Sequence, residues 1–486
     1  MPPYFDLADL SFTYPQAGRR GLAPISLQAA SGEVLLLTGS SGSGKSTLAR
    51  CLTGLIPHLY HGELRGQALV AGLSTAETPL WQLSQCAGLV FQNPAAQMLA
   101  PTVAEEILFG LENLGLEHAG MQRRLDETLE RFGLFDFSTR TPRTLSGGEQ
   151  QKLALAAILA RQPDGLVLDE PLSMLDSTSA LNFVSLIGEQ AAAGRAVIIC
   201  EHRHEYLHSL PALRTLQLEI ASSNGSPPGS GTADPVRLPT TVSELPPFPA
   251  SQPAAAPVHL CLGGVSAWRG SNLVLDRLDL DLLGGQVTAL IGPNGVGKTT
   301  LLRLLAGFQP YEGSLEITAE PGRRPALGMV FQNPDLQLFN ASVRTEILHG
   351  LPTQPPDSEY YTWLLHALGL QAYEDTPPLL LSEGEKRRLA LAMVLIHRPE
   401  HGILLDEPSL GQDAPHKHTL IQALRAVAAS GVIVLVATHD LELAARADRM
   451  LLLSRRGILA DGPPARVLAD TGAWHELGLI IPEWVH

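Results

Sequence analysis

Two glycine-rich stretches carry the residue types that bind phosphate. The first reads GSSGSGKST at residues 39–47, and the second reads GPNGVGKTT at residues 292–300. Each follows a short apolar run typical of a strand, and helices are expected to follow at 48–55 and 301–308. Glycines in such a loop let backbone N–H groups surround the phosphates of a nucleotide. One such loop could arise by chance, but two in the same context predict two nucleotide-binding P-loops.

Several residues of these loops are candidate ligands of a nucleotide such as ATP and of Mg²⁺. We expect Lys45 and Lys298 to reach the terminal phosphates, and Ser46 and Thr299 to bind Mg²⁺. The candidate ATP-binding residues are Gly39, Ser40, Gly42, Gly44, Lys45, Ser46 and Thr47 in the first loop, and Gly292, Asn294, Gly295, Gly297, Lys298, Thr299 and Thr300 in the second.

An acidic pair follows a short apolar run in each half of the chain. Asp169 and Glu170 come after LVL, and Asp406 and Glu407 come after ILL. At the end of a buried strand, the aspartate could hold Mg²⁺ through water and the glutamate could polarise an attacking water. The alternative is a surface loop, which the preceding strand-like residues make less favourable.

A glutamine and a histidine recur at matching places. The pentapeptide VFQNP occurs unchanged in both halves and contains Gln92 and Gln332, whose amide oxygens could bind Mg²⁺ and contact the γ-phosphate. The alternative is a polar residue that begins a turn. His202 and His439 end matching strands, although most of the 16 histidines are expected to be structural. Tyr14 could stack on an adenine ring or pack on the core.

A second kind of anion site is predicted at two helix N-termini. LSGGEQQ at 145–151 and LSEGEKRR at 381–388 each introduce a helical run. Free N–H groups and the positive end of the helix dipole attract phosphate there. If this site lies on a different face from the P-loop of its own unit, it would serve the nucleotide of the other unit. The candidate residues are Ser146, Gly147, Gly148, Glu149, Ser382, Gly384 and Glu385.

The order of these motifs repeats, so the chain is expected to hold two similar units. The offset between matching residues is 253 at the P-loops but 240 at the glutamines, which places a 13-residue excess in the first unit between these motifs. We expect units at 1–220 and 258–486. Between them, 24 of the 37 residues of 221–257 are Pro, Gly, Ser or Ala, a composition typical of a linker.

Composition excludes several classes of protein. The net charge of −15 argues against a general nucleic-acid binder and against docking on anionic lipid by charge alone. No apolar run approaches the ~20 residues needed to span a bilayer, and nothing at the N-terminus marks the chain for secretion. Membrane contact would therefore need a protein partner. The segments 95–113 and 335–350 each predict a turn and then a helix, either an ordinary amphipathic helix or a contact surface for such a partner.

The four cysteines are interpreted as reduced thiols. Cys51, Cys86, Cys200 and Cys261 are too scattered for a CxxC metal site, and they lie in predicted core or helix segments. The only metal that the sequence predicts is Mg²⁺, with candidate ligands Ser46, Gln92, Asp169, Thr299, Gln332 and Asp406.

These duplicated motifs resemble those of ATP-binding cassette (ABC) ATPases over nearly all of the chain outside the linker. The resemblance implies an α/β fold of two tandem cassettes, each with a RecA-like P-loop core, a helical subdomain and an antiparallel β subdomain. It also implies an intramolecular dimer that holds two ATP molecules, each between the P-loop of one unit and the LSGGE-type motif of the other. The glutamates would be catalytic bases and the histidines γ-phosphate sensors.

One residue departs from the family pattern. Glu383 stands where the family usually has a glycine, and a carboxylate near a γ-phosphate would be repulsive, although one turned aside into solvent would do little. We therefore expect the ATP site built on Lys45 to be the weaker hydrolase.

A narrower resemblance is to the ATPases of energy-coupling-factor (ECF) importers of the thiamine-precursor or cobalt type. It rests on both VFQNP segments, TVAEEILFGLEN at 102–113, EHR at 201–203, SLGQD at 409–413 and GLIIPEW at 478–484. This resemblance implies a protein at the cytoplasmic face of the cell membrane, without direct membrane insertion. Its partners would be an integral membrane coupling subunit and a substrate-binding membrane subunit.

Three alternatives fit less well. The fused ATPase of a simple-sugar importer matches the length, but it fits VFQNP and EHR poorly. In soluble twin-cassette proteins that act on ribosomes, the linker between the cassettes is expected to be charged and helical, whereas this linker is rich in proline. DNA-repair cassettes would require zinc-binding cysteine pairs, which the sequence lacks.

Overall fold

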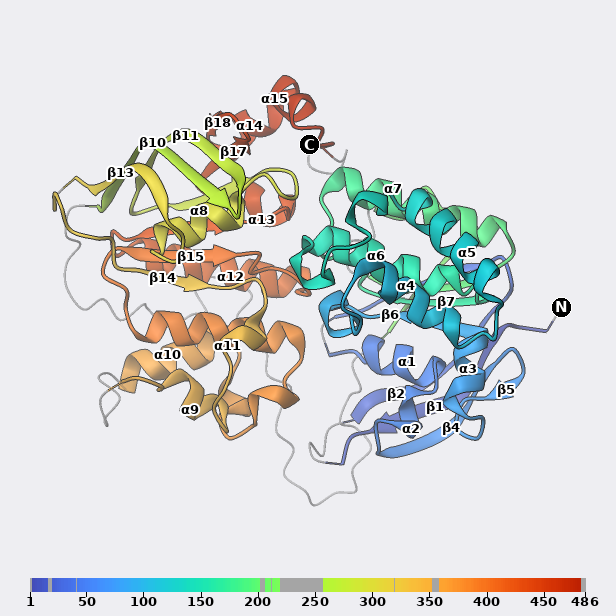
Figure 1. Ribbon diagram of the computed structural model, residues 1–486. Helices are drawn as coiled ribbons and strands as arrows, with labels where there is room; N and C mark the ends of the chain where they lie inside the picture. The colour runs from blue at the N-terminus through green and yellow to red at the C-terminus, as the bar shows by residue number, and fades with distance from the viewer. Residues whose placement is uncertain are drawn as a thin grey trace, which may run out of the picture. The chain divides into compact units, whose positions relative to one another are not determined.

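The computed structural model describes residues 2–15, 20–40, 42–201, 206–210, 212–218, 257–318, 320–351 and 358–481. The chain divides into two compact units, Met1–Thr232 and Ala233–His486 (Figure 1). The division falls inside the predicted linker, whose residues 221–256 lie outside the described ranges. The linker therefore stays a prediction.

Unit 1 is an alternating α/β unit. Its strands are β1 (Phe5–Thr13), β2 (Arg20–Ala29), β3 (Val34–Thr38), β4 (Glu63–Val70), β5 (Leu73–Ser74), β6 (Ala87–Val90), β7 (Gly165–Asp169), β8 (Ala196–Cys200) and β9 (Leu213–Gln217). Its helices are α1 (Lys45–Leu52), α2 (Leu55–His58), α3 (Leu80–Cys86), α4 (Val103–Glu112), α5 (His118–Arg131), α6 (Gly147–Ala160) and α7 (Ser177–Ala192), with short 3-10 helices at Pro94–Ala96, Phe135–Phe137 and Pro142–Thr144.

The core sheet of unit 1 is parallel, with strand order β6-β7-β8-β3-β9. Every residue of β7 and β8 is buried, as expected for a parallel sheet covered on both faces. Val167 faces the cluster shared with α1 and the second sheet, whereas Leu168 faces the cluster shared with α4 to α7. That second sheet is antiparallel, with order β2-β1-β4-β5.

Unit 2 repeats this plan. Its strands are β10 (His259–Arg269), β11 (Asn272–Leu283), β12 (Val287–Ile291), β13 (Tyr311–Ile317), β14 (Leu327–Val330), β15 (Gly402–Asp406), β16 (Ile433–Ala437), β17 (Arg449–Ser454) and β18 (Gly457–Gly462). Its helices are α8 (Lys298–Leu305), α9 (Val343–Ile347), α10 (Ser358–Leu368), α11 (Glu383–Ile396), α12 (Ala414–Ala428), α13 (Leu441–Ala445), α14 (Pro464–Ala469) and α15 (Thr471–Glu476), with 3-10 helices at Pro334–Leu336, Gln371–Tyr373 and Pro378–Leu380.

The core sheet of unit 2 has order β14-β15-β16-β12-β17-β18 and is parallel except for β18. The antiparallel sheet β11-β10-β13 forms a separate layer, and α8 lies between the two sheets, in contact with β10, β11, β14, β15 and β16 (Figure 1). Helices α9, α10 and α11 lie beyond the core sheet on its other side. The predicted fold class is thereby confirmed.

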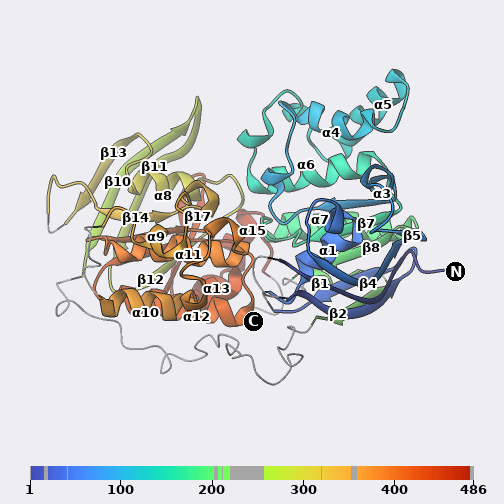
Figure 2. The ribbon, with the colours of Figure 1, turned by 90° about the horizontal axis from the view of Figure 1, so that it is seen from below.

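The 13-residue excess predicted for unit 1 corresponds to an added piece of structure. Between the P-loop helix and the glutamine, unit 1 has α2, β4, β5, α3 and β6, whereas among the described residues unit 2 has only β13 and β14. In Figure 2, α4 and α5 lie at the end of unit 1 opposite to β1 and β2. Among the helices of the described ranges, none combines the length and the apolar character that crossing a membrane requires.

At the start of β15, the backbone packs closely against the neighbouring strand β16. Gly402 has φ = 141°, and a Cβ added there would collide with the carbonyl oxygen of Ile433 on β16. Gly402→Ala is expected to lower the free energy of unfolding by more than about 2 kcal/mol, because it adds backbone strain to a clash. Gly472→Ala, within α15 and with its nearest atom 3.5 Å away, is the control. Equal urea-denaturation midpoints for the two variants would contradict this account.

Candidate nucleotide-binding sites

Each P-loop ends in a glycine that starts the following helix. Gly44 (φ = 98°) and Gly297 (φ = 117°) are the N-caps of α1 and α8. A Cβ on Gly297 would lie 2.8 Å from Leu275 Cδ2, so a larger residue would have to displace that side chain in addition to adopting an unfavourable φ. Because these left-handed glycines turn the chain directly into the helix, α1 and α8 begin at Lys45 and Lys298, three residues before the predicted starts.

The two P-loop lysines are buried and lie against their own loops. Lys45 Nζ donates to the carbonyl oxygen of Gly39 at 2.7 Å, and Lys298 Nζ donates to that of Gly292 at 2.6 Å. Each ammonium group therefore lies at its own loop, where it would attract a phosphate. The other predicted residues of this region lie in the same loops or in the first turns of α1 and α8: Ser40, Gly42, Ser46, Thr47, Asn294, Gly295, Thr299 and Thr300.

The acidic pairs lie at the carboxyl ends of buried strands, as predicted. Asp169 is the last residue of β7, and Asp406 is the last residue of β15. The next residues, Glu170 and Glu407, have φ values of 48° and 52°, which non-glycine residues rarely adopt. The main-chain N–H of each donates at 2.8 Å to the last residue of the neighbouring strand, β8 or β16. The same strained backbone therefore recurs at the same place in both units.

The hydroxyl and carboxylate oxygens predicted to bind Mg²⁺ lie together. Thr299 Oγ1 donates to Asp406 Oδ2 at 2.8 Å, and the Ser46 side chain hydrogen-bonds to Asp169. Asp169 Oδ1 is buried and has no hydrogen-bond partner among the described residues. Oxygen donors of this kind suit Mg²⁺. We infer that the residues fit the ion.

Burial makes these aspartates harder to ionise. Burial raises the pKa of Asp406 to about 6, and the nearby charge of Glu407 adds to the effect, although Thr299 and Lys298 oppose it. Burial likewise raises the pKa of Asp169, against the hydrogen bond from Ser46. A bound cation would relieve this cost, because it favours the charged form of both carboxylates.

In unit 2, both carboxylate oxygens of the catalytic candidate Glu407 have close polar partners. Its carboxylate accepts hydrogen bonds from Thr438 Oγ1 at 3.0 Å and from the main-chain N of His439 at 3.2 Å, and it lies 2.8 Å from His439 Nδ1. Burial alone would raise the pKa of Glu407, but His439, Lys298 and Thr438 outweigh it and lower that pKa. Thr438 was not predicted from the sequence.

Unit 1 surrounds its glutamate differently. Gln92 Nε2 donates to Glu170 Oε2 at 2.7 Å, which brings two predicted residues together. Where unit 2 has Thr438, unit 1 has Glu201, which is buried and accepts a hydrogen bond from the main-chain N of Leu172 at 2.9 Å. The charge of Glu201 also raises the pKa of Asp169, as a lesser contribution after burial. His202 lies outside the described residues, so its role stays a prediction.

Gln332 is anchored through its main chain. Arg387 Nη1 donates to the carbonyl oxygen of Gln332 at 2.6 Å. Ser146 and Ser382 are the N-caps of α6 and α11, and both form capping boxes with a glutamate three residues later, Glu149 or Glu385. The glycines Gly147, Gly148 and Gly384 lie in the first turns of these helices. That these helix ends serve the nucleotide of the opposite unit stays a prediction.

Glu383, the departure from the family pattern, has a charge partner. Lys386 Nζ lies 3.4 Å from its carboxylate and 2.8 Å from that of Asp335. Glu383 is therefore not a bare negative charge, and its expected repulsion of a phosphate is reduced.

Tyr14 packs beside the helix that follows the first P-loop. Its ring meets that of Phe12 edge to face at 4.7 Å. Its hydroxyl accepts a hydrogen bond from Arg50 at 3.1 Å and lies 3.4 Å from Thr47 Oγ1. These contacts hold the ring near the P-loop, and adenine stacking stays a prediction.

Comparison with known proteins agrees with this geometry. The ABC transporter family model matches residues 22–173 and 275–410. A Bacillus subtilis (strain 168) protein named "Putative HMP/thiamine import ATP-binding protein" is 33% identical, covering 98% of this chain and 95% of that protein. A Methanosarcina acetivorans protein named "Putative ABC transporter ATP-binding protein" is 32% identical over 99% of this chain and 89% of its own length. The chain belongs to the ABC transporter family, and it is an ATPase.

Solved structures confirm the tandem-cassette fold. A chain in the crystal structure of the archaeal ribosome recycling factor aABCE1 with the ribosomal stalk protein aP1 gives a TM-score of 0.58 at 20% identity, covering 96% of this chain and 92% of that one. A structure named RNase-L Inhibitor gives 0.57 at 21% identity, covering 95% and 93%. At these identities the likeness concerns the fold alone.

Because the pKa of Asp406 is raised, its charged carboxylate is expected to lower the free energy of unfolding at neutral pH. The folded state holds this proton more tightly than the unfolded chain, whose pKa is about 3.9. Stability therefore falls as pH rises from about 4 to about 6, and the loss persists above that window. Asp406→Asn is expected to stabilise the protein at pH 7.5, with nucleotide and Mg²⁺ removed, by about 1–3 kcal/mol.

Calorimetry at pH 7.5 and pH 5 measures this effect. The gain in Tm should shrink at pH 5, where the buried carboxyl is protonated. The control is Asp276→Asn, which changes an exposed aspartate of β11. A gain that is the same at both pH values, or a loss at pH 7.5, would show that the charge of Asp406 is not the cause.

Proposed function

We propose that the chain is the energising ATPase of an ECF-type importer that takes up a vitamin such as a thiamine precursor, or a cobalt-like metal ion. It would work at the cytoplasmic face of the cell membrane. Its partners would be an integral membrane coupling subunit and a substrate-binding membrane subunit. The main support is the likeness to the Bacillus subtilis protein named for HMP/thiamine import, because it extends over both units.

In the proposed catalytic cycle, the protein residues bind ATP, orient it and handle a proton. Lys45 and Lys298 would bind the phosphates, and Glu170 and Glu407 would accept a proton from the attacking water. His439, which contacts Glu407, would orient that carboxylate and sense the γ-phosphate. Mg²⁺, when bound, would neutralise charge on the phosphates. The serine-capped helix ends of α6 and α11 would complete the site on the opposite unit.

An exposed loop after each glutamine supports a membrane partner. These exposed loops are residues 94–102 in unit 1 and 334–342 in unit 2. Each presents apolar side chains to solvent, among them Leu99 (73% exposed), Leu336 (67%) and Phe339 (67%). Exposed apolar side chains at matching positions of a repeat are typical of a protein-binding surface.

The exposed loops are braced from inside by a buried glutamate. Glu106 Oε2 accepts hydrogen bonds from the main-chain N of Leu99 at 2.8 Å and of Ala100 at 2.7 Å. In unit 2, Glu346 Oε2 accepts from Phe339 at 3.0 Å and from Asn340 at 2.6 Å. Because the bracing is the same in both units, each loop can move as one piece with α4 or α9.

A second glutamine ties each exposed loop to the strand that ends at the ATP site. Gln97 accepts from the main-chain N of Phe91 at 3.2 Å and donates to the carbonyl oxygen of Leu89 at 3.2 Å. Gln337 makes the same two bonds in unit 2, at 3.0 and 3.2 Å. Since Phe91 and Phe331 precede Gln92 and Gln332, a change at the nucleotide would be passed to the exposed loops.

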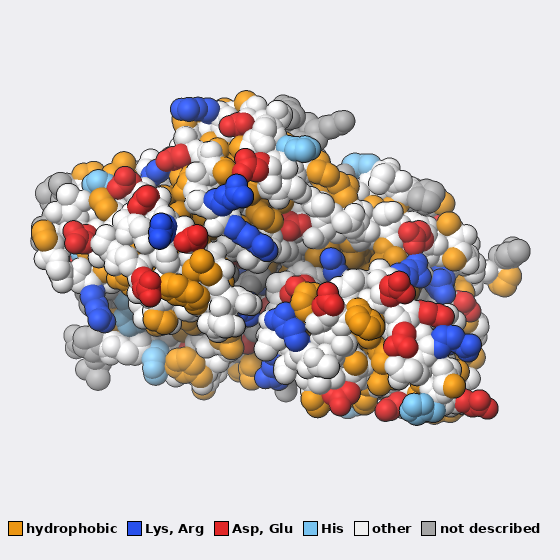
Figure 3. Space-filling view, turned by 45° about the horizontal axis from the view of Figure 1, so that its top comes forward, with side chains coloured by type: hydrophobic (Ala, Val, Ile, Leu, Met, Phe, Trp, Pro, Cys, Tyr) orange, Lys and Arg blue, Asp and Glu red, His pale blue; other side chains and the backbone are white. Residues whose placement is uncertain are grey.

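A nucleic-acid-binding function is less well supported. The chain carries a net charge of −15. On the face drawn in Figure 3, acidic and basic side chains of the described residues are interspersed, without a broad basic area. Phosphate backbones are bound mainly by clustered lysine and arginine.

The two glutamates are expected to contribute unequally to turnover. Glu407→Gln should lower the ATPase rate by about 100-fold or more, since it removes the general base. Glu170→Gln should cost less, because Glu201 adds a third carboxylate beside Asp169 and Glu383 would add a negative charge to this site in the proposed dimer. Steady-state ATPase assays of both variants, with the exposed Glu476→Gln as control, measure this. Equal losses would contradict the asymmetry.

Capture from membranes tests the proposed partners. The tagged chain, isolated from detergent-solubilised native membranes, should bring a transmembrane coupling protein and a small substrate-binding membrane protein, identified by mass spectrometry. Phe339→Asp should reduce that recovery, because it places a charge on the apolar surface, while leaving ATP binding intact. Leu273→Asp, at an exposed apolar residue of β11, is the control. Recovery of ribosomal or DNA-repair proteins without a membrane subunit would overturn the proposal.

A further inference from the structure

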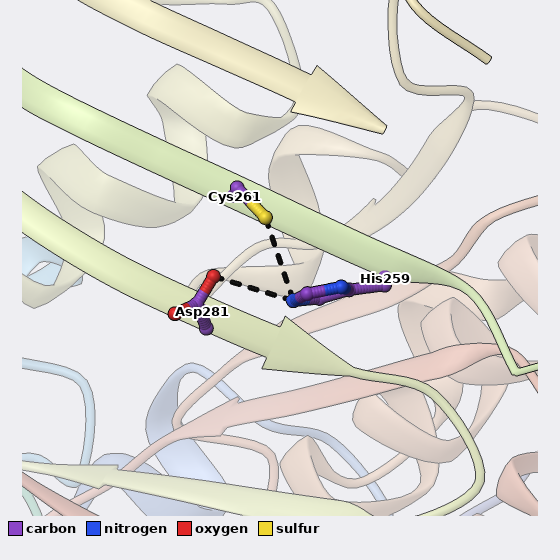
Figure 4. A group of neighbouring side chains, drawn as sticks. All are labelled: His259, Cys261 and Asp281. Atoms are coloured by element: carbon purple, nitrogen blue, oxygen red, sulfur yellow. Dashed lines mark hydrogen bonds and ion pairs between the residues drawn. The ribbon is translucent and has the colours of Figure 1, made fainter. Parts of the chain in front are cut away.

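A histidine, a cysteine and an aspartate meet on one face of the antiparallel sheet of unit 2. His259 and Cys261 lie two residues apart on β10, so both side chains point to the same face. Asp281 on β11 pairs directly with Cys261 in the antiparallel register, which puts its carboxylate on that face too. Figure 4 shows the three side chains pointing toward one another from the two strands.

The donor atoms are spaced as metal ligands would be. His259 Nε2 lies 3.3 Å from Asp281 Oδ1 and 3.4 Å from Cys261 Sγ, and all three atoms lie within 4.8 Å of one another. A tetrahedral Zn²⁺ ion with bonds of about 2.1 Å to N and O and about 2.3 Å to S holds its ligand atoms about 3.4–3.6 Å apart. Little movement would be needed to receive the ion.

The surroundings fix the histidine in a suitable orientation. Thr318 Oγ1 lies 3.1 Å from His259 Nδ1. When Nδ1–H donates to this hydroxyl, Nε2 directs its lone pair at the other two donors. A polar group that orients a ligating histidine in this way is typical of metal sites.

The neighbouring charges also favour a cation. Glu316 on β13 pairs with Cys261 from the other side, which adds a carboxylate on the same face. Arg449 donates to the main-chain oxygen of Asp281, but its guanidinium is paired with the carboxylate of Asp461 at 2.6 Å. The side chain of Asp281 is 67% exposed and that of His259 is 37% exposed, so an ion can reach them from solvent.

A second cluster of possible metal ligands differs from this one, because an arginine already contacts its carboxylates. Glu320, Glu400 and His401 also lie close together. There, however, Arg323 already contacts both carboxylates, at 2.6 and 2.5 Å, and supplies the positive charge. That cluster is explained as an ion-pair network.

We propose that His259, Cys261 and Asp281 bind a divalent transition-metal ion, Zn²⁺ by preference, at a site separate from the two nucleotide sites. Imidazole, thiolate and carboxylate together suit Zn²⁺ and its neighbours, whereas Mg²⁺ and Ca²⁺ prefer oxygen alone. Three protein ligands leave a fourth position for water or for Glu316. The site ties β10 to β11, the two strands that pack on the P-loop helix α8. The inference does not depend on what is transported.

Cobalt substitution tests the site directly. Co²⁺ is added to the untagged, reduced, full-length chain with nucleotide and Mg²⁺ removed. We expect a thiolate-to-cobalt charge-transfer band that saturates at one Co²⁺ per chain and disappears when Zn²⁺ is added. The band requires a cysteine ligand, so binding to the other histidines does not produce it. No such band, or a stoichiometry other than one, would overturn the proposal.

Variants assign the ligands. Cys261→Ser and His259→Ala should each abolish the band and weaken Zn²⁺ binding, measured by calorimetry, by about 100-fold or more. Thr318→Val should weaken it by about 10-fold or more, because the histidine loses its orienting partner. Cys86→Ser, at another partly exposed cysteine, is the matched control and should change neither readout. Metal-free Tm values show whether each variant is folded. A band that survives in folded Cys261→Ser, or is lost in Cys86→Ser, would place the thiolate elsewhere and refute the site.

Discussion

A buried aspartate at the end of a core strand imposes an electrostatic cost on each unit. At β15, burial and the neighbouring charge of Glu407 raise the pKa of Asp406, while Thr299 and Lys298 oppose that rise. The strained backbone at Glu170 and Glu407 belongs to the same arrangement, because the turn places the second carboxylate beside the first. The surrounding fold, with its fully buried strands, maintains a geometry that these groups would not adopt alone.

The duplication does not make the two sites identical. Around Glu407 the partners are a hydroxyl, a main-chain N–H and an imidazole, all of which stabilise a carboxylate. One partner of Glu170 is the side-chain amide of Gln92, and a further buried carboxylate, Glu201, acts on Asp169. The departure at Glu383 is compensated within its own helix by Lys386. The described surroundings of the two glutamates therefore differ, in addition to the one residue that departs from the family pattern.

A short series of hydrogen bonds connects each exposed loop to the interior of its unit. Gln97 and Gln337 tie each exposed loop to the strand that ends at the ATP site, while Glu106 and Glu346 hold the apolar side chains outward. Burying an acidic side chain is costly unless it is well hydrogen-bonded. Glu106 and Glu346 meet this condition at the same place in both units, through the main-chain N–H groups of the exposed loops.

The sequence by itself determined the features that are local along the chain. P-loops, acidic pairs and serine caps each depend on a few consecutive residues between a strand and a helix, so motif and spacing predicted them and their duplication. Tertiary structure alone decided which groups surround each acidic pair, since Thr438 reaches Glu407, and Glu201 reaches Leu172 beside the other pair, from the end of a neighbouring strand. It likewise decided that Cys261, interpreted as an ordinary thiol, faces His259 and Asp281. Asp281 lies twenty residues further along the chain and reaches Cys261 only through the register of two antiparallel strands, which no local pattern specifies.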